Sequence, residues 1–482
     1  MKKIKSFTLV ALFLMVFFAT LSCSKKTSGS VQPVTPVTPV TPVKTDVSMW
    51  LTTPDRQSLL QKQNIGLLFS AATNSNTTIN VDTTTQYQSI DGFGFALTGG
   101  SATLINGLPA AQQDALLKEL FATDSTNIGI SYLRISIGAS DMSAGDFTYD
   151  DVSGTDVNLQ NFSISKEMTD LIPVLKKIIA INPSIKILGS PWTAPAWMKT
   201  NNSFSQGSLS TVYYDAYARY FVKYIQAMQQ QGITIDAVTP QNEPLNANNN
   251  PSMVMQPVEE ENFVKNNLGP QFKAAGLTTR IIIYDHNADR TDYPLTILAD
   301  PAAYQYVDGS AFHLYAGNIS ALTPVHTAYP NKNLYFTEIY TASTGSFSGD
   351  LLWHLNNVII GATRNWCRNV IEWNLATDPS FGPHTNGGCT TCQGALTIGS
   401  FIARNVSYYI IAHASKFVRP GAVRIASDNE TILPNVAFKN TDGSKVLIVL
   451  NSGTTAQTFN IKFNLKIVTS TLAAGAVATY KW

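Results

Sequence analysis

Charged side chains are scarce in this chain. Its 482 residues include 33 Lys and Arg and 32 Asp and Glu, which make up 13% of the sequence and leave a formal net charge of +1. Nucleic acids and acidic membrane surfaces are bound by clustered Lys and Arg, so the composition argues against both as partners. Aromatic residues reach 10%, and Asn, Thr and Ser are plentiful. Such a surface favours uncharged polar ligands that stack on aromatic rings, sugars among them.

Cysteine is equally scarce, with four in the chain. Cys389 and Cys392 enclose two threonines, a spacing that suits a redox pair, half of a metal site or a small disulfide. The sequence has no second CxxC pair to complete a zinc site, and no thioredoxin-like segment surrounds this one. We therefore predict a structural disulfide between Cys389 and Cys392 in an oxidising compartment, a buried Cys367, and neither a metal nor a cofactor.

The first apolar run, Phe7–Ala19, is too short to span a membrane and follows a basic segment, as in a secretory signal. Ser22 precedes Cys23 as a small residue does at bacterial lipoprotein cleavage sites, although Thr20 stands where an apolar residue is usual. We predict a lipoprotein signal peptide over residues 1–22, lipidation of Cys23 and export to the cell envelope, with the membrane contacted only through this lipid. Ordinary signal-peptide cleavage beside an incidental cysteine is the alternative.

Residues 23–46 are predicted to form a stalk. They contain VQPVTPVTPVTPV, in which proline at every third position favours polyproline II of about 3 Å per residue. A stalk after a lipid anchor holds a catalytic domain away from a membrane. A Pro-rich docking peptide is the alternative, but the sequence between the prolines lacks the basic residues that such ligands usually carry.

From about Ile90 the chain alternates short apolar runs with helical patterns such as Ala110–Phe121, Met168–Ile181 and Tyr213–Gln230. This alternation is typical of repeated βα units, and eight of them in about 320 residues predict a (β/α)₈ barrel. The eight predicted strands are Gly92–Leu97, Tyr132–Gly138, Ile185–Ser190, Ala237–Pro240, Arg280–Tyr284, Gly309–Leu314, Leu334–Thr337 and Val370–Trp373.

Both flanks of the barrel region are rich in strand-type residues instead. We predict an α/β fold: a TIM barrel at 86–412 with an accessory β-sandwich built from N-terminal strands at 47–85 and C-terminal strands at 413–482. The predicted sandwich strands are Val47–Leu51, Thr77–Val81, Val436–Phe438, Val446–Leu450, Thr458–Phe463 and Ala476–Trp482.

Catalytic side chains of such barrels lie at the carboxyl ends of the strands. Glu243 and Glu338 both fall there, 95 positions apart, which is close to three βα units of about 30 residues and assigns them to strands 4 and 7. These strands lie nearly opposite across the barrel mouth. Two carboxyls about 5 Å apart would serve as the nucleophile and acid/base of a retaining glycosidase.

The two glutamates need different ionisation states. The one that acts as nucleophile must be ionised, whereas burial and the neighbouring negative charge are expected to raise the pKa of the other, the acid/base, and keep it protonated. Asn242 can donate to the sugar 2-OH. Asp285 and His286 lack a third metal ligand at suitable spacing, so we interpret them as polar residues of a loop or of the site wall.

Seven motifs then occur in one order: Asp91–Gly94, Leu133–Ser136, Ser190–Asn201, Gln241–Pro244, Phe312–Tyr315, Thr337–Glu338 and Glu372–Leu375. This ordered set resembles glycoside hydrolase family 30, the family of glucosylceramidases and β-1,6-glucanases, over Val47–Trp482. The resemblance implies Glu243 as acid/base and Glu338 as nucleophile. It also implies Tyr315 as a hydrogen-bond donor near the nucleophile and Arg134 as the residue that keeps it ionised. Around the sugar it places Asp141, Trp192, Asn242, His313 and Trp373.

The segment Asn386–Gly394 resembles a Gly-Gly-Cys-x-x-Cys loop of the β-1,6-glucanase branch, which comparable glucosylceramidases lack. We therefore expect a monomeric endo-β-1,6-glucanase acting on β-glucan. A glucosylceramidase-type β-glucosidase with a sphingolipid substrate is the alternative. A non-enzymatic glycan-binding lipoprotein is a further alternative. The presence of both carboxylates argues against it. Transglycosylation in place of hydrolysis stays open.

Overall fold

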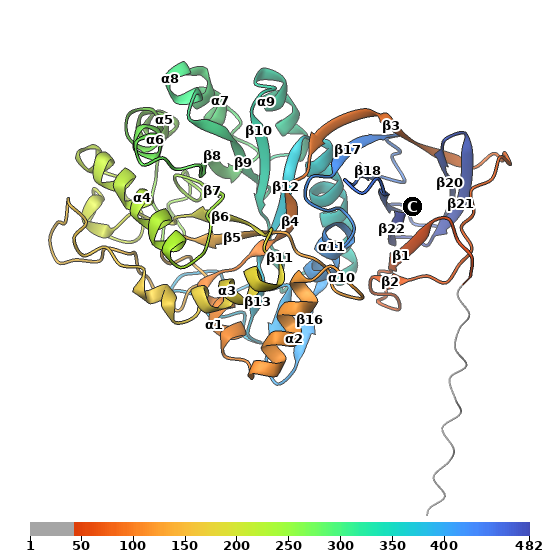
Figure 1. The fold of residues 1–482 in the computed structure, drawn as a ribbon, viewed down its shortest axis with the longest axis horizontal. Coiled ribbons are helices and arrows are strands. Elements are labelled where there is room, and N and C mark those ends of the chain that lie inside the picture. Colours follow the sequence, from red (N-terminus) through yellow and green to blue (C-terminus); the bar gives the residue numbers. More distant parts are fainter. Residues whose placement is uncertain (1–42) are drawn as a thin grey trace, which may run out of the picture. The chain divides into compact units, whose positions relative to one another are not determined.

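The computed structural model describes residues 43–482 (Figure 1). The predicted signal peptide, Cys23 and most of the predicted stalk lie outside the described residues. Within 43–482, no helix combines the length and the apolar character needed to cross a bilayer. These residues form one compact unit.

Eight parallel strands close into a barrel in the order β10-β12-β4-β5-β6-β7-β8-β9 (Figure 1). This confirms the predicted fold class and all eight predicted barrel strands. Their bounds are β4 (Gly92–Ala96), β5 (Tyr132–Ser136), β6 (Lys186–Ser190), β7 (Ala237–Val238), β8 (Arg280–Asn287), β9 (Val307–His313), β10 (Asn333–Glu338) and β12 (Cys367–Asn374).

Helices pack around the barrel through one apolar face each. In α4 (Tyr214–Gln230), for example, Tyr217, Tyr220 and Tyr224 recur at helical spacing and are all buried. Two π-helical segments, Val264–Leu268 and Leu355–Ala362, continue α5 and α10. The other helices are α1 (Gly99–Asn106), α2 (Ala110–Phe121), α3 (Leu171–Ile181), α5 (Pro257–Phe263), α6 (Gly269–Ala274), α7 (Asp292–Ala299), α8 (Pro301–Tyr304), α9 (Leu322–Ala328), α10 (Phe347–His354) and α11 (Val406–Ser415).

The inside of the barrel is filled, not hollow. One buried side chain from each of seven strands forms an apolar layer across it, and this layer closes the barrel below its mouth. The layer consists of Tyr132, Leu188, Ala237, Ile282, Ala311, Tyr335 and Ile371.

The sandwich combines both ends of the described chain in the strand order β2-β1-β22-β19-β18-β17-β3-β20-β21. Its long strand β3 pairs with β20 over Thr77–Asn80 and with β17 between Val81 and Ser89, so it links the two parts of the sandwich. The bounds are β1 (Ser48–Thr52), β2 (Gln61–Lys62), β3 (Thr77–Ser89), β17 (Val423–Ser427), β18 (Asn435–Lys439), β19 (Lys445–Leu450), β20 (Gln457–Phe463), β21 (Lys466–Leu472) and β22 (Val477–Lys481).

The sandwich differs from the prediction in detail. Strand β3 extends to Ser89, well beyond the predicted Thr77–Val81, and β17 and β21 had not been predicted as separate strands. The pairing of N-terminal with C-terminal strands is confirmed, because β1 lies antiparallel to β22. The residue boundaries of the two domains stay a prediction.

Barrel and sandwich meet at α11 through a buried histidine. The ring of His413 lies with Nδ1 2.9 Å from Thr479 Oγ1 on β22 and Nε2 2.8 Å from Thr52 Oγ1 on β1. Burial lowers the pKa of His413 to about 3, so the imidazole is neutral at physiological pH.

Five short strands at the barrel mouth shape the rim. β11 (Thr341–Ala342) follows β10 directly and pairs with β14 (Cys392–Gln393). β13 (Ala376–Thr377) follows β12 and pairs with β15 (Leu396–Ile398), to which β16 (Ile402–Arg404) adds.

Candidate active site

A second layer of inward-facing side chains lies on top of the apolar layer. Side chains on one face of a strand recur at every second residue, so six members of the apolar layer are followed, two positions later, by another buried inward residue. These six residues are Arg134, Ser190, Thr239, His313, Thr337 and Trp373. The floor of the barrel mouth is therefore polar and aromatic, directly above an apolar plug.

Strand β8 breaks this alternation. Two positions after Ile282 the inward residue would be Tyr284, but the register against β9 shifts between Tyr284 and His286. The backbone has positive φ at Tyr284 and Asp285. Such a bulge re-aims a side chain, and here it turns Asp285 into the barrel. Left-handed backbone at non-glycine residues costs free energy and collects at functional sites.

Asp285 is fully buried and lies at the centre of the polar layer. Burial raises the pKa of Asp285, but Arg134, His313 and the surrounding hydroxyls outweigh it and hold the pKa well below its ordinary value. Asp285 is thus a permanent buried anion. Its carboxylate accepts hydrogen bonds from Arg134 Nη2 at 2.7 Å, Ser190 Oγ at 2.8 Å, Thr239 Oγ1 at 2.9 Å and Thr337 Oγ1 at 2.7 Å.

Arg134 on β5 connects this anion to Glu338, the last residue of β10. Its Nη1 donates to Glu338 Oε2 at 2.5 Å, and Tyr315 donates its hydroxyl to Glu338 Oε1 at 2.9 Å. The guanidinium carbon lies 4.9 Å from the ring centre of Trp192. Each oxygen of Glu338 therefore has a donor, which fixes the orientation of the carboxylate and favours its anionic form.

Glu243 lies in the loop after β7, with a φ of 46°. Its backbone N–H donates to Asp285 O at 3.0 Å, and Asn246 Nδ2 donates to its Oε2 at 2.7 Å. Carboxylate oxygens of Glu243 and Glu338 lie within 4.8 Å of each other. Retaining glycosidases separate their carboxyls by about 5 Å and inverting ones by about 6.5 Å or more, so the geometry is of the retaining kind.

The ionisation of Glu243 differs from the expectation. Burial raises the pKa of Glu243, but His313, His286 and Asn246 together lower it to about 2. The expected increase was wrong because it omitted His313, whose Nδ1 lies 3.2 Å from Glu243 Oε1. Burial lowers the pKa of His313, yet Glu338, Asp285 and Glu243 raise it to about 9.

One proton accounts for both shifts. His313 Nε2 lies 3.1 Å from Asp285 Oδ1, and this anion keeps a proton on that nitrogen. A second proton then lies between Nδ1 and Glu243 Oε1. With that proton on His313 the glutamate is a carboxylate, and with it on Glu243 the imidazole is neutral, while the total charge is unchanged.

Glu338 is pulled in both directions. Burial raises the pKa of Glu338, and so do the charges of Glu243 and Asp285, whereas His313 and Arg134 lower it. The net direction is upward. The direct Arg134 contact on Oε2 nevertheless supports the anionic form of Glu338.

Asp141 faces both glutamates across the pocket. Burial raises the pKa of Asp141, with repulsion from Glu338 and Glu243 adding to it, and the result is a pKa of about 8. Its Oδ1 is buried without a hydrogen-bond partner among residues 43–482. A protonated carboxyl here can donate to a ligand hydroxyl.

The resemblance-based site residues fall into two groups. Asp141, Glu243, Tyr315, Glu338 and Trp373 line an open pocket of about 570 Å³. The others are buried directly behind it: Asn242 accepts from Arg134 Nη2 at 2.6 Å, the ring of Trp192 lies 5.3 Å from that of Trp373, and His313 contacts Glu243. The pocket is also lined by His286, which the sequence had suggested only as a polar residue of a loop or of the site wall.

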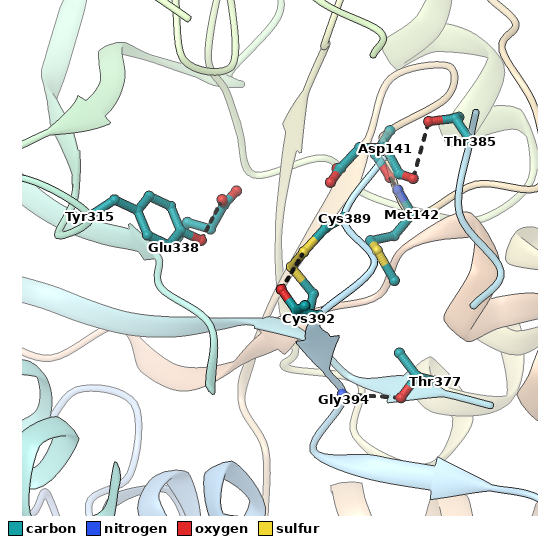
Figure 2. The surroundings of a disulfide bond; sticks show 11 residues. Asp141, Met142, Tyr315, Glu338, Thr377, Thr385, Cys389, Cys392 and Gly394 are labelled. Carbon is teal, nitrogen blue, oxygen red and sulfur yellow. Dashed lines mark hydrogen bonds between the residues drawn. A yellow bond between two sulfur atoms is a disulfide. The ribbon is translucent and has the colours of Figure 1, made fainter. Parts of the chain in front are cut away.

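A disulfide-bridged loop forms one wall of this pocket. Cys389 and Cys392 are bonded to each other, and Cys392 enters β14, which pairs with β11 just after Glu338. On the other side of the loop, Thr385 N donates to Asp141 O at 2.8 Å. Figure 2 shows the disulfide beside Asp141, with Glu338 and Tyr315 across from it. Cys367 is free and buried.

Glu243, His313 and Glu338 are also the one group in residues 43–482 whose ligand atoms come close enough to share a metal ion. Their contacts do not favour such use. Arg134 and Tyr315 occupy the oxygens of Glu338, and the other nitrogen of His313 faces Asp285. A cation here would meet the Arg134 guanidinium at close range.

Two family models match this chain. The glycosyl hydrolase family 30 TIM-barrel domain matches residues 90–418, and the family 30 β-sandwich domain matches residues 421–480. The chain belongs to glycosyl hydrolase family 30. The family assignment makes it a glycosyl hydrolase and confirms the resemblance inferred from the ordered motifs.

Family 30 relatives of two kinds resemble the chain. An endo-1,6-β-D-glucanase of Neurospora crassa is 37% identical over 402 residues, 78% of this chain and 82% of the relative. A putative glucosylceramidase of Caenorhabditis elegans is 30% identical over 415 residues, 80% of this chain and 79% of the relative. A solved structure described as an endo-β-1,6-glucanase has a TM-score of 0.86 and 40% identity, covering 91% of this chain and 99% of that one.

Proposed function

We propose that this hydrolase is an endo-β-1,6-glucanase that retains anomeric configuration, with Glu338 as nucleophile and Glu243 as acid/base. The observation that carries the mechanism is the pair of carboxylates within 4.8 Å, of which Glu338 contacts Arg134 and Glu243 contacts His313. The substrate rests on the relatives, because the endo-1,6-glucanases are 37% to 40% identical to this chain and the putative glucosylceramidase of Caenorhabditis elegans 30%.

In the first step, an oxygen of Glu338 attacks the anomeric carbon and the bond to the leaving glucosyl O6 breaks. The leaving O6 takes the proton that Glu243 and His313 share. The products are a glycosyl ester on Glu338 and a shortened glucan with a free 6-hydroxyl. Because the shared proton lies one hydrogen bond from Glu243, the acid form of Glu243 is reached without recruiting a proton from solvent.

In the second step, Glu243 is unprotonated and accepts a proton from water. The water oxygen attacks the anomeric carbon, and the ester bond to Glu338 breaks to restore its carboxylate. Esterification has removed the negative charge of Glu338, which had been the strongest attraction raising the pKa of His313. Attack by a sugar hydroxyl in place of water would give transglycosylation.

The remaining site residues are proposed to orient the sugar. Asn242 uses its oxygen to accept from Arg134, so its amide nitrogen is left to donate to the 2-OH, a bond that strengthens in the transition state. Asp141, protonated near neutral pH, donates to a second hydroxyl. Trp373 offers an aromatic face beside the two carboxylates.

The location of the enzyme is also a proposal, and it rests on the N-terminal sequence. The signal-like residues 1–22, Cys23 and the proline-rich stalk support an exported, lipid-anchored monomer that acts on β-glucan outside the cytoplasm. Replacing Cys23 by Ala in the full chain should release the enzyme from the membrane fraction, without changing its turnover.

The roles of the two glutamates are tested by azide rescue. With an activated aryl β-glycoside, Glu338→Gly plus azide should yield an α-glycosyl azide, and Glu243→Gly plus azide a β-glycosyl azide. The opposite pairing would exchange the roles. Glu430→Gln, a carboxylate on the sandwich, is the matched control and should turn over at the wild-type rate.

The substrate is tested by product release from pustulan, laminarin and glucosylceramide. We expect release from pustulan, with the first product in the β-configuration by NMR. Preferential release from glucosylceramide would assign the lipid substrate instead, and an α-configured first product would refute retention.

A further inference from the structure

A second cavity of about 850 Å³ lies between the N-terminal strands of the sandwich and the side of the barrel, and it exceeds the active-site pocket in volume. We call it the side groove. It is lined by Trp50, Leu59 and Lys62 from the N-terminal segment and by Glu119, Arg404 and Tyr409 from the barrel. None of the motifs that identify the family contributes to it.

The side groove leads toward the active site. A cavity of about 400 Å³ shares Leu59, Arg404 and Tyr409 with it and extends to Gln393. Gln393 lies in β14 next to Cys392, which lines the active-site pocket. The middle cavity thus shares three lining residues with the side groove and reaches the strand that carries a wall residue of the active-site pocket.

The chemistry of the side groove suits an uncharged ligand. Arg404 is occupied by a two-bond ion pair with Glu119, through Nε at 2.9 Å and Nη2 at 2.5 Å. Lys416 Nζ donates to the carbonyls of Ser125 and Asn127, each at 2.7 Å. A phosphate or carboxylate would have to displace the protein partners of Arg404 and Lys416. The third cation of the lining, Lys62, lies with Nζ 5.3 Å from the ring centre of Trp50.

Aromatic rings supply the other half of the site. Trp50 and Tyr409 are half-buried on the wall, and each is backed by another ring, Trp50 by Phe417 at 4.5 Å and Tyr409 by Phe347 at 6.0 Å. Rings braced in this way present fixed apolar faces. A pyranose has apolar C–H faces and equatorial hydroxyls, which match aromatic faces and an Arg–Glu pair together.

We propose that the side groove is a second glucan-binding site, which holds a distal part of the same β-glucan chain that is cleaved between Glu243 and Glu338. The identity of this glucan rests on the proposed function. The reach of the middle cavity to β14, whose Cys392 lines the active-site pocket, favours a long substrate over a separate ligand. The expected consequence is a gain in affinity through effective concentration, which short substrates cannot obtain.

The kinetic test compares long and short substrates for Trp50→Ala and Tyr409→Ala, with Phe401→Ala as control. Phe401 is 74% exposed and lines neither cavity. We expect KM for polymeric β-1,6-glucan to rise about ten-fold in both variants. For a gluco-oligosaccharide too short to leave the active-site pocket, KM should change less than two-fold. Equal losses on both substrates, or none on the polymer, would overturn the proposal.

A binding test separates this proposal from the proposed function. In native gels containing pustulan or laminarin, the inactive Glu338→Gln protein should migrate more slowly than in plain gels. Adding Trp50→Ala or Tyr409→Ala should reduce this retardation and leave only the part due to the active-site pocket. If turnover shows a different β-glucan as the substrate, the same gels identify the polymer that the side groove binds. Retardation of undiminished size in both double variants refutes the groove even if pustulan is cleaved.

Discussion

Replacing His313 tests two contributions to the acid/base Glu243 separately: the proton that His313 shares with it and the hydrogen bond between them. In His313→Asn, an amide near the position of Nδ1 can still contact Glu243, but it carries no titrating proton. In His313→Gln, the longer side chain can reach Asp285 instead and leaves Glu243 without this partner. Comparing the two variants distinguishes loss of the shared proton from loss of geometry.

The size of the effect follows from the buried charges. Its neighbours raise the pKa of His313 from 6.5 to about 9, which at about 1.4 kcal/mol per pH unit is a net attraction of about 3 kcal/mol. The side chain is fully buried, so solvent screens little of it. Without His313, Glu243 must hold the proton alone; burial still raises its pKa, and the contact that lowered it most is gone. The basic limb of the pH profile of kcat/KM should therefore move to lower pH by about two pH units.

The assay is the pH dependence of kcat/KM on β-1,6-glucan and on an aryl glycoside whose leaving group needs no proton. We expect the basic limb to move on glucan in both His313 variants, and kcat on the aryl glycoside to fall much less. Tyr315→Phe, which removes a donor from Glu338 without touching the shared proton, should keep the wild-type limb. A basic limb at the wild-type pH in His313→Asn would refute the shared proton.

Three further predictions concern positioning and stability. Arg134→Lys loses the link between Glu338 and Asp285, so kcat/KM on an aryl glycoside should fall about a hundred-fold or more; a loss below ten-fold would contradict this role. Cys389→Ser opens a loop whose ends are three positions apart, so unfolding should cost about 2 kcal/mol less. KM should rise several-fold and kcat stay within two-fold, and reductant should reproduce this both in wild type and in Cys367→Ser, which keeps the disulfide. Because the pKa of His413 is lowered to about 3, its stabilising effect is complete above pH 6.5 and is lost as pH falls toward 3. In urea unfolding, the free energy of unfolding should fall by about 2 kcal/mol between pH 7 and pH 5. In His413→Asn this dependence on pH should be weaker, and an unchanged dependence would refute the role of His413.

The barrel could be predicted because its strands are short apolar runs buried on both sides and separated by helical patterns. The sandwich was predicted less fully. The hairpin between β20 and β21 turns at Asn464 and Leu465, both with positive φ, and no glycine marks it. Strand β3 crosses from one partner to another, and such a change of partner leaves no trace in local residue preferences.

The two glutamates could be located because each follows a recognisable barrel strand. Asp285 could not be assigned its role, because the β8 bulge overrides the alternation that would have turned it outward. The ionisation of Glu243 also escaped prediction, since it depends on His313, which is 70 positions away in the chain but 3.2 Å away in the fold. Charges that meet only in three dimensions leave no sequence pattern.

The pairing of β1 with β22 has a consequence for synthesis. β1 comprises Ser48–Thr52 and is synthesised long before β22, which comprises Val477–Lys481. Until those residues arrive, this edge of β1 lies open to other extended chains. The barrel segment can complete its local contacts first, so the sandwich closes last. A chain truncated by even its final strand would expose both β1 and β19, and aggregation or proteolysis would then remove incompletely synthesised molecules.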